Sequence, residues 1–308
     1  MMTADNVPDR LLQLPDGRAL GYRVWGDPAG TPLLFLHGTP GSRLKLGLGH
    51  RAAMGLGLAI VAPDRWGYGL TDLPPVPSLA AFATDMAALM DHLGHTTFAV
   101  GGISGGGPYA TAVAAHLGTR VGAVALVSPM GPVAELAAHA SLAPFHRLCF
   151  AFLPQHPWAT RAVFRAFRAS LARSPRLAAR LATLRGGRHD RAALAQPEIA
   201  RWLLGSFREG LRRGLQGPVT DLRLFSTRWG IDPRAVRAPS RLWIGTADTA
   251  VPLSAARLLG QSLPACAVTE LAGEGHFWIA TNYAEVLAWV AQVVHSTLPR
   301  ARGATGGF

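Results

Sequence analysis

The sequence predicts an α/β fold, in which a mostly parallel central sheet is flanked by helices and interrupted by a helical insertion. Short apolar segments without polar alternation are separated by helical patterns, which is typical of a parallel sheet covered on both faces. This alternation stops near residue 131 and resumes near residue 221. Serine, aspartate and histidine residues directly follow predicted strands, at the edge of a parallel sheet where functional sites form.

The elements before the insertion can be assigned in chain order. Residues 11–26 predict two strands around an Asp16-Gly17 turn, a dipeptide typical of hairpins. Four apolar runs then predict buried strands, and apolar residues at helical spacing predict the helices between them. These strands cover residues 32–36, 58–62, 97–100 and 122–127, and the helices cover residues 43–54, 79–93 and 109–117.

The insertion covers residues 132–220 and carries no strand pattern. It is rich in arginine, alanine and leucine at helical spacing and is broken by prolines. The α/β pattern then returns, with strands over residues 241–246 and 267–271 and helices over residues 253–263 and 278–297. The polar, glycine-rich residues 300–308 are predicted to be disordered. We therefore predict a core of residues 1–131 and 221–308 around this insertion.

Composition points to one large domain. The chain has 308 residues, of which 49% are apolar, and this is enough to bury a sizeable core. Its first residues show neither the basic start nor the apolar segment of a signal peptide, and no apolar run reaches transmembrane length. Cys149 and Cys266 fall in different predicted parts of the fold, which favours reduced thiols. These features predict a cytoplasmic protein. No pattern in the sequence predicts its oligomeric state.

The turn between the strand at 97–100 and the helix at 109–117 carries the strongest chemical signal. It contains the pattern G-x-S-x-G, from Gly102 through Ser104 to Gly106. Such a turn projects the serine hydroxyl above the sheet, and glycine on either side avoids a collision with backbone. The pattern predicts a nucleophilic serine. A glycine-rich turn with an incidental serine, or a phosphate-binding loop, is the alternative, whereas the spacing G-x-G-x-x-G of dinucleotide sites does not open this helix.

A nucleophilic serine needs a histidine base and a carboxylate that orients it. Asp248 follows the strand at 241–246, and His276 follows the next strand, so both fall on the same sheet edge as Ser104. As an alternative, Asp248 could cap the following helix. Glu274 is the competing carboxylate, but it lies two residues from His276 on a tight loop and is badly placed to reach the far ring nitrogen.

Acyl transfer also needs two donors for the developing oxyanion. The N–H group of Gly105 is one candidate, and the N–H group of Thr39, in the loop after strand 32–36, is the second. A glycine- and proline-rich turn without a catalytic role is the alternative for the Thr39 loop. Tyr109 and Trp278 are candidate walls of a substrate pocket, although either could belong to the core. The sequence shows no metal-ligand cluster of useful spacing, so we predict neither a metal nor another cofactor.

These motifs resemble the α/β-hydrolase superfamily over essentially residues 10–298. The resemblance implies that Ser104 is the nucleophile, His276 the base and Asp248 the acid, with Thr39 and Gly105 forming the oxyanion hole. It also implies that residues 132–220 are a cap over the pocket and that the loop holding Asp64 is structural. The matching motifs are His37-Gly38-Thr39-Pro40-Gly41, Pro63–Asp72, Gly102-Ile103-Ser104-Gly105-Gly106, Gly245-Thr246-Ala247-Asp248 and Gly273-Glu274-Gly275-His276.

The resemblance predicts a serine hydrolase that cleaves an ester, thioester or amide bond of a small-molecule acyl substrate through an acyl-enzyme. A C–C bond hydrolase and an iminopeptidase-like enzyme on the same triad remain open, as does a ligand-binding receptor with little turnover. The serine at position 104 argues against related dehalogenases and epoxide hydrolases, which carry aspartate there. Cofactor-free haloperoxidase-like members share the triad, which leaves a peroxidase side activity open.

Positive charge is concentrated in the insertion. The formal net charge is +12, and residues 147–213 hold a net charge of +11 from 14 arginines and three acidic residues. Arg161, Arg165 and Arg168 fall on one helical face. Such a face could attract an anionic substrate, an acidic carrier protein or an anionic membrane surface, or it could simply be solvated. Interleaved aromatics and a recognition motif are missing, which argues against nucleic-acid binding.

Overall fold

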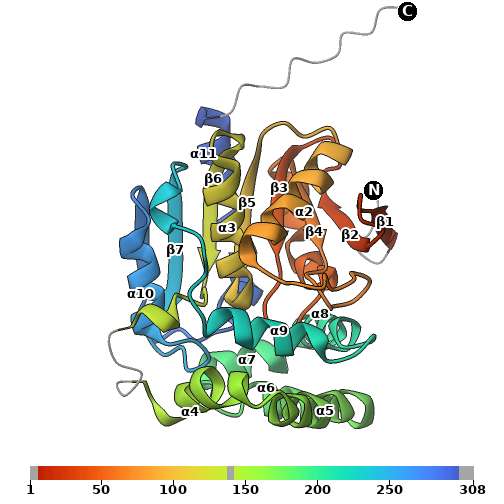
Figure 1. The fold of residues 1–308 in the computed structure, drawn as a ribbon, viewed down its shortest axis with the longest axis vertical. Helices are drawn as coiled ribbons and strands as arrows, with labels where there is room; N and C mark the ends of the chain where they lie inside the picture. Colours follow the sequence, from red (N-terminus) through yellow and green to blue (C-terminus); the bar gives the residue numbers. More distant parts are fainter. Residues whose placement is uncertain (1–5, 137–141, 298–308) are drawn as a thin grey trace, which may run out of the picture.

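A computed structural model describes residues 6–136 and 142–297 (Figure 1). The predicted disorder of residues 300–308 therefore lies outside the described residues. The described chain forms an eight-stranded sheet in the order β1-β2-β4-β3-β5-β6-β7-β8, in which β1–β2 and β2–β4 pair antiparallel and all other pairs are parallel. The strands are β1 (Arg10–Gln13), β2 (Ala19–Gly26), β3 (Thr31–Leu36), β4 (Leu58–Pro63), β5 (Phe98–Ile103), β6 (Val121–Val127), β7 (Ser240–Gly245) and β8 (Cys266–Leu271).

Helices cover both faces of the sheet, which confirms the predicted fold class. In β3, Leu34 and Leu36 pack on the side of α2, α3 and α10, whereas Leu33 and Phe35 pack on the side of α1 and α11. The central strands are buried on both faces, and this explains why they are continuously apolar in sequence. These helices are α1 (His50–Gly55), α2 (Leu79–His92), α3 (Gly107–Leu117), α10 (Leu253–Ser262) and α11 (Ile279–Thr297).

The inserted segment is helical, as the sequence predicts, and it lies at one end of the sheet (Figure 1). Close backbone approaches show which end this is. Gly210 abuts Gly41, which follows β3, and Gly217 packs on the ring of Tyr68, which follows β4. The segment therefore covers the carboxyl ends of the parallel strands. Its helices are α4 (Pro144–Arg147), α5 (Pro157–Arg173), α6 (Pro175–Ala182), α7 (Arg188–Ala195), α8 (Pro197–Gly210) and α9 (Gln216–Phe225).

Two details differ from the sequence-based elements. The helix predicted over residues 43–54 is a 3₁₀ helix, η2 (Arg43–Gly49), followed by the short α1. Glycine allows this close packing, because a Cβ at Gly47 would lie 2.7 Å from the ring of Trp202 in α8. In addition, α9 runs across the predicted boundary at residue 220 and ends at Phe225.

Among the described residues, no helix is long and apolar enough to span a membrane. Cys149 and Cys266 are both free thiols, and burial raises the pKa of each to about 11. Neither thiol is therefore an activated nucleophile.

Candidate active site

Ser104 lies at the turn between β5 and α3, in a conformation that few side chains adopt. Its φ is +56°, in the left-handed region, and its residue is 8% exposed. The turn leaves no space for larger neighbours. A Cβ at Gly102 would lie 2.4 Å from the carbonyl oxygen of Gly106, and a Cβ at Gly106 would lie 2.5 Å from that of Leu36. Both glycines are needed sterically, as the G-x-S-x-G pattern predicts.

The two partners predicted for Ser104 lie beside it. The Nε2 atom of His276 is 3.0 Å from the Oγ atom of Ser104, and its Nδ1 atom is 2.7 Å from Oδ2 of Asp248. The second carboxylate oxygen of Asp248 accepts the N–H groups of Ala250 and Val251. These loop hydrogen bonds fix the carboxylate, while α10 begins only at Leu253. Asp248 therefore stabilises its own loop rather than capping the helix.

Glu274, the competing carboxylate, points away from His276. Its Oε2 atom lies 3.0 Å from Nδ1 of His189, and both side chains are partly exposed. Arg188 donates to the other ring nitrogen of His189. The tight loop thus separates the two acidic groups, so that only Asp248 reaches the ring of His276.

The loop after β3 lies directly against the Ser104 turn. A Cβ at Gly38 would be 3.0 Å from Cβ of Ser104, and a Cβ at Gly105 would be 2.1 Å from Oγ1 of Thr39. Within the part of the chain that the structure describes, the N–H group of Thr39 donates to no acceptor. The two predicted donor residues are therefore adjacent, and each stands next to the serine.

A buried polar cluster beneath this loop was not predicted from the sequence. Asp221, in α9, is 1% exposed and accepts hydrogen bonds on both carboxylate oxygens. Its four donors are Arg65 Nη1 at 2.7 Å, Tyr109 Oη at 2.7 Å, Tyr68 Oη at 2.6 Å and Thr39 Oγ1 at 2.5 Å. Burial raises the pKa of both tyrosines well above the usual range, with a further contribution from Asp221, so both hydroxyls remain donors.

Arg65 extends this cluster to the loop backbone. Its guanidinium donates to the carbonyl oxygens of His37 and Gly38 and to the hydroxyl of Thr39. The ring of His37 is fully buried and accepts the N–H group of Arg65 on Nε2, while Nδ1 donates to Gly38. Burial, assisted by the charge of Arg65, holds the pKa of His37 well below its usual range. His37 is thus a structural residue that holds the loop backbone.

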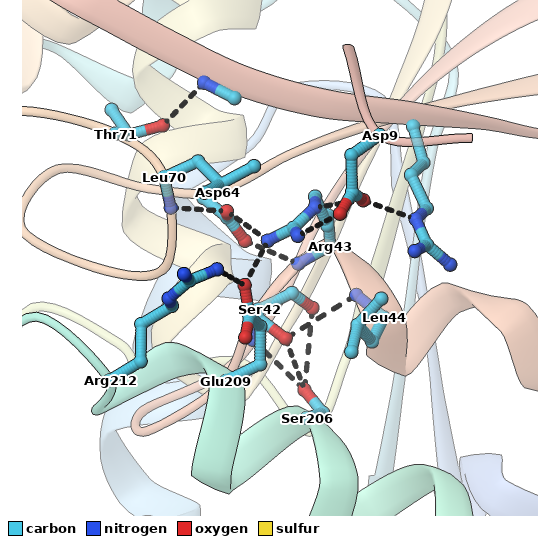
Figure 2. Close-up of polar contacts among 12 residues, drawn as sticks. Asp9, Ser42, Arg43, Leu44, Asp64, Leu70, Thr71, Ser206, Glu209 and Arg212 are labelled. Atoms are coloured by element: carbon cyan, nitrogen blue, oxygen red, sulfur yellow. Dashed lines mark hydrogen bonds and ion pairs between the residues drawn. The ribbon is translucent and has the colours of Figure 1, made fainter. Parts of the chain in front are cut away.

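A second polar cluster fixes the other end of the same loop (Figure 2). Arg43 is 1% exposed and forms ion pairs with Asp9, Asp64 and Glu209, which come from three distant parts of the chain. Burial would raise the pKa of Asp9, but hydrogen bonds from Arg43 and Arg23 outweigh it and lower the pKa to about 2. Ser206 of α8 donates to the carbonyl oxygen of Ser42 beside this cluster.

The inserted segment also holds the loops of the candidate histidine and aspartate. Asp190, in α7, is 2% exposed and accepts the N–H group of Phe277, the residue after His276, at 2.8 Å. Thr249, the residue after Asp248, donates to the carbonyl oxygen of Arg185 at 2.8 Å. No motif in the sequence marks Asp190 or Arg185, because the partner of each lies far away in the chain and each contact joins a side chain to a backbone group.

The two candidate pocket walls have different surroundings. Tyr109 is buried, packs edge-on against Phe82 and Phe225, and donates to Asp221. Trp278 lines a cavity of about 330 Å³ together with His189, Ala192, Ala193, Gln196, Glu274, Phe277, Thr281 and Asn282. That cavity lies beside the His276 loop, and Ser104 is not among its lining residues. Among the described residues, no group of three or more His, Cys, Asp or Glu side chains could hold a metal ion.

Comparisons with known proteins give partial sequence matches to two relatives. The chain is 37% identical over 113 residues to the uncharacterised hydrolase YcgS of Bacillus subtilis, covering 37% of this chain and 39% of that protein. It is 33% identical over 133 residues to a non-heme chloroperoxidase of Streptomyces lividans, covering 38% of this chain and 44% of that protein. The match thus spans about two fifths of each curated relative.

Structural similarity extends over nearly the whole chain. An esterase from Exiguobacterium antarcticum superposes with a TM-score of 0.67 at 16% identity, covering 92% of this chain and 98% of the esterase. At this level of identity the likeness concerns the fold alone. The model of the α/β hydrolase fold family matches residues 31–283. With its sheet order, its strand-to-helix serine turn and this match, the chain belongs to the α/β-hydrolase family.

Proposed function

We propose that the protein is a serine hydrolase that cleaves an ester, thioester or amide bond in a small-molecule acyl substrate. One observation carries the proposal. The Oγ atom of Ser104, the ring of His276 and the carboxylate of Asp248 form a continuous hydrogen-bonded chain, with distances of 3.0 and 2.7 Å. This is the arrangement that makes a serine hydroxyl nucleophilic, since the hydroxyl alone is a poor nucleophile.

The proposed reaction proceeds in two steps. His276, whose Nδ1–H group donates to Asp248, takes the proton of Ser104 on Nε2 as the oxygen attacks the carbonyl carbon. The protonated ring then gives this proton to the leaving group, and an acyl-enzyme remains. Water, deprotonated by His276, attacks the acyl-enzyme, the acid is released, and the proton returns to Ser104.

The N–H groups of Thr39 and Gly105 would stabilise the oxyanion in both steps. Their residues stand next to Ser104, and the loop of Thr39 is held from below by Arg65 and Asp221. Donors that are fixed before the reaction stabilise the transition state without reorganising. In this proposal the helices of residues 132–220 form the cap over the site.

A fluorophosphonate probe followed by intact-mass measurement tests the proposal. We expect one probe per chain in the unmodified protein and none in Ser104→Ala or His276→Ala. Thr281→Ala removes an exposed hydroxyl in α11, the helix that follows the His276 loop. This variant is the matched control and should label at the original rate. A folded, unmodified protein that does not react would overturn the assignment of Ser104. Ester, thioester and amide panels would then identify the bond type in the reactive protein.

The likeness to a non-heme chloroperoxidase favours a second candidate activity at the same site. In it, hydrogen peroxide instead of water attacks the acyl-enzyme, and the product is a peroxy acid rather than a carboxylic acid. Both activities require the same acyl-enzyme. Peroxy acid formation from an accepted ester and hydrogen peroxide, with Ser104→Ala as the blank, distinguishes the two, because only the second candidate yields an oxidising product.

A further inference from the structure

One stretch of the insertion contains only positive charge. Residues 136–189 include nine arginines and no aspartate or glutamate. This stretch contains α5 and α6, which lie at the outer edge of the molecule, with α8 and α9 between them and the sheet (Figure 1). Within the described residues, six of these arginines have neither an ion pair nor a hydrogen bond through the side chain, namely Arg161, Arg165, Arg168, Arg173, Arg176 and Arg180. The guanidinium groups of these six arginines therefore stabilise the described fold through no ion pair or hydrogen bond.

The same region exposes most of the large apolar side chains on the described surface. Seven of the ten exposed large hydrophobic residues fall between residues 148 and 184. Where exposed apolar side chains lie together on a surface, they often mark an interaction site, whereas isolated ones do not. The seven are Leu148 (46% exposed), Phe152 (43%), Trp158 (68%), Val163 (51%), Leu177 (45%), Leu181 (42%) and Leu184 (75%).

Helix α6 presents an apolar stripe to solvent. Leu177 and Leu181 follow the spacing i, i+4, so they lie on one side of α6, and the exposed Leu184 follows shortly after the helix ends at Ala182. Arg176 and Arg180, each one residue before a leucine of the stripe, flank it and are exposed. Only Ala178 of this helix is buried against the rest of the protein. The stripe therefore faces outward, with guanidinium groups along its edge.

Helix α5 contacts α6 and also exposes apolar and basic side chains. Its buried side includes Ser170 and Leu171, while Trp158, Arg161 and Arg165 are exposed, at a spacing that places them on one side. We call the exposed side of residues 157–184 the α5–α6 face. It combines an exposed tryptophan, a leucine stripe and unpaired arginines, which is the composition of helices that lie in the interface of a bilayer.

We propose that the α5–α6 face docks the protein onto the surface of an anionic phospholipid bilayer. The leucines of α6 and Trp158 would enter the boundary between headgroups and acyl chains. The flanking arginines would bind lipid phosphates, for which the planar guanidinium is well suited. This inference concerns binding and does not depend on the proposed hydrolysis.

Charge argues against other occupants of the face. A second copy of the chain would bring an equally basic face against it, and like charges at close range oppose such a dimer. An acidic protein could pair with the arginines, but it would have to match the shape of a shallow leucine stripe. A bilayer accepts apolar side chains and pairs with arginines at once, without shape complementarity.

Vesicle flotation of the full chain tests the proposal. We expect binding to phosphatidylcholine vesicles that contain about 30 mol% phosphatidylglycerol, weak binding to phosphatidylcholine alone, and loss of binding in high salt. Arg176→Glu/Arg180→Glu should reduce partitioning at least about tenfold. Leu177→Ser/Leu181→Ser keeps every charge and should also reduce it, because the apolar contribution is lost.

A matched pair of charge changes controls for net charge. Arg234→Glu/Arg237→Glu alters exposed arginines that precede β7, at the amino ends of the strands and thus opposite the insertion. This variant should float like the unmodified protein, as should Ser104→Ala. Equal loss in the control variant, or no binding of the unmodified chain, overturns the proposal. A dimer in sedimentation velocity that Leu177→Ser/Leu181→Ser dissociates would assign the face to a second copy instead.

Discussion

Two arginines of the core, Arg43 and Arg65, and two of the insertion, Arg165 and Arg176, have opposite surroundings. Arg65 and Arg43 are almost fully buried, and each pairs with carboxylates from distant parts of the chain. Arg165 and Arg176 are exposed on α5 and α6 and pair with no described residue. A buried guanidinium is tolerated only with good partners, whereas an exposed one costs the fold almost nothing. Arg43 and Arg65 therefore fix loops, whereas Arg165 and Arg176 are free to bind a group outside the protein.

The largest expected effect comes from removing the carboxylate of Asp221. Asp221→Ala leaves Arg65 buried without its counter-ion and three hydroxyl donors without an acceptor. Breaking a buried pair from one side costs about 3–5 kcal/mol of unfolding free energy. Urea denaturation measures this loss. Asp91→Ala, which removes an exposed carboxylate that pairs with Arg120 at 2.6 Å, is the matched control and should cost at most about 1 kcal/mol.

The core also contains a buried cation, Lys45, that has no partner among the described residues, and it can be compared with the paired arginines. Lys45 is 3% exposed, and within the described residues its ammonium forms no ion pair or hydrogen bond. Burial, assisted by the charge of Arg65, lowers its pKa from 10.5 to about 8. At neutral pH the native state therefore carries an unfavourable buried charge, in contrast to the paired charges of Arg43 and Arg65.

Lys45→Met should raise the unfolding free energy at pH 7 by an amount on the order of 3 kcal/mol. Between pH 8 and pH 10.5 the unfolded chain binds more protons than the native state, so the stability of the unmodified protein rises with pH. The advantage of Lys45→Met should therefore vanish across this range. Denaturation curves of both proteins at several pH values measure this difference in unfolding free energy. A destabilised variant, with a difference that does not depend on pH, would contradict the prediction.

A smaller effect is expected where the insertion contacts the candidate histidine loop. Asp190→Ala removes the acceptor for the N–H group of Phe277, and a hydrogen bond to a charged group contributes about 1.5–3 kcal/mol. Because His276 is the adjacent residue, its ring should lose its position against Ser104. We expect the rate of fluorophosphonate labelling to fall roughly tenfold at temperatures where the protein stays folded.

Two further variants separate positioning from stability. Asp190→Asn keeps an oxygen acceptor and should restore most of the labelling rate. Glu274→Gln weakens only the partly exposed contact with His189 and should label normally. Stability loss in Asp190→Ala without any change in labelling rate would reduce Asp190 to a purely structural role.

The sequence predicted the parts of the molecule that depend on local patterns. Continuous apolar runs located the central strands, and residues at strand ends, including Ser104, Asp248 and His276, converge because parallel strands end at one edge. The catalytic roles of these residues stay predictions. The contacts of Asp221 and Asp190 could not be predicted, because each joins the insertion to a core loop by tertiary packing alone. The 3₁₀ helix at Arg43–Gly49 was not predicted for the same reason, since its packing against α8 determines it.

The smallest expected effect on stability returns to the unpaired arginines. Arg165→Glu/Arg168→Glu removes no contact of the described structure, so the unfolding free energy should stay within about 0.5 kcal/mol of the original. Hydrolysis of a neutral, soluble ester should also be unchanged. If the arginines instead steered anionic substrates to the site, the rate with an anionic ester would fall and its salt dependence would flatten. Comparing neutral and anionic esters in this variant therefore shows whether the arginines dock the protein onto a surface or attract anionic substrates to the site.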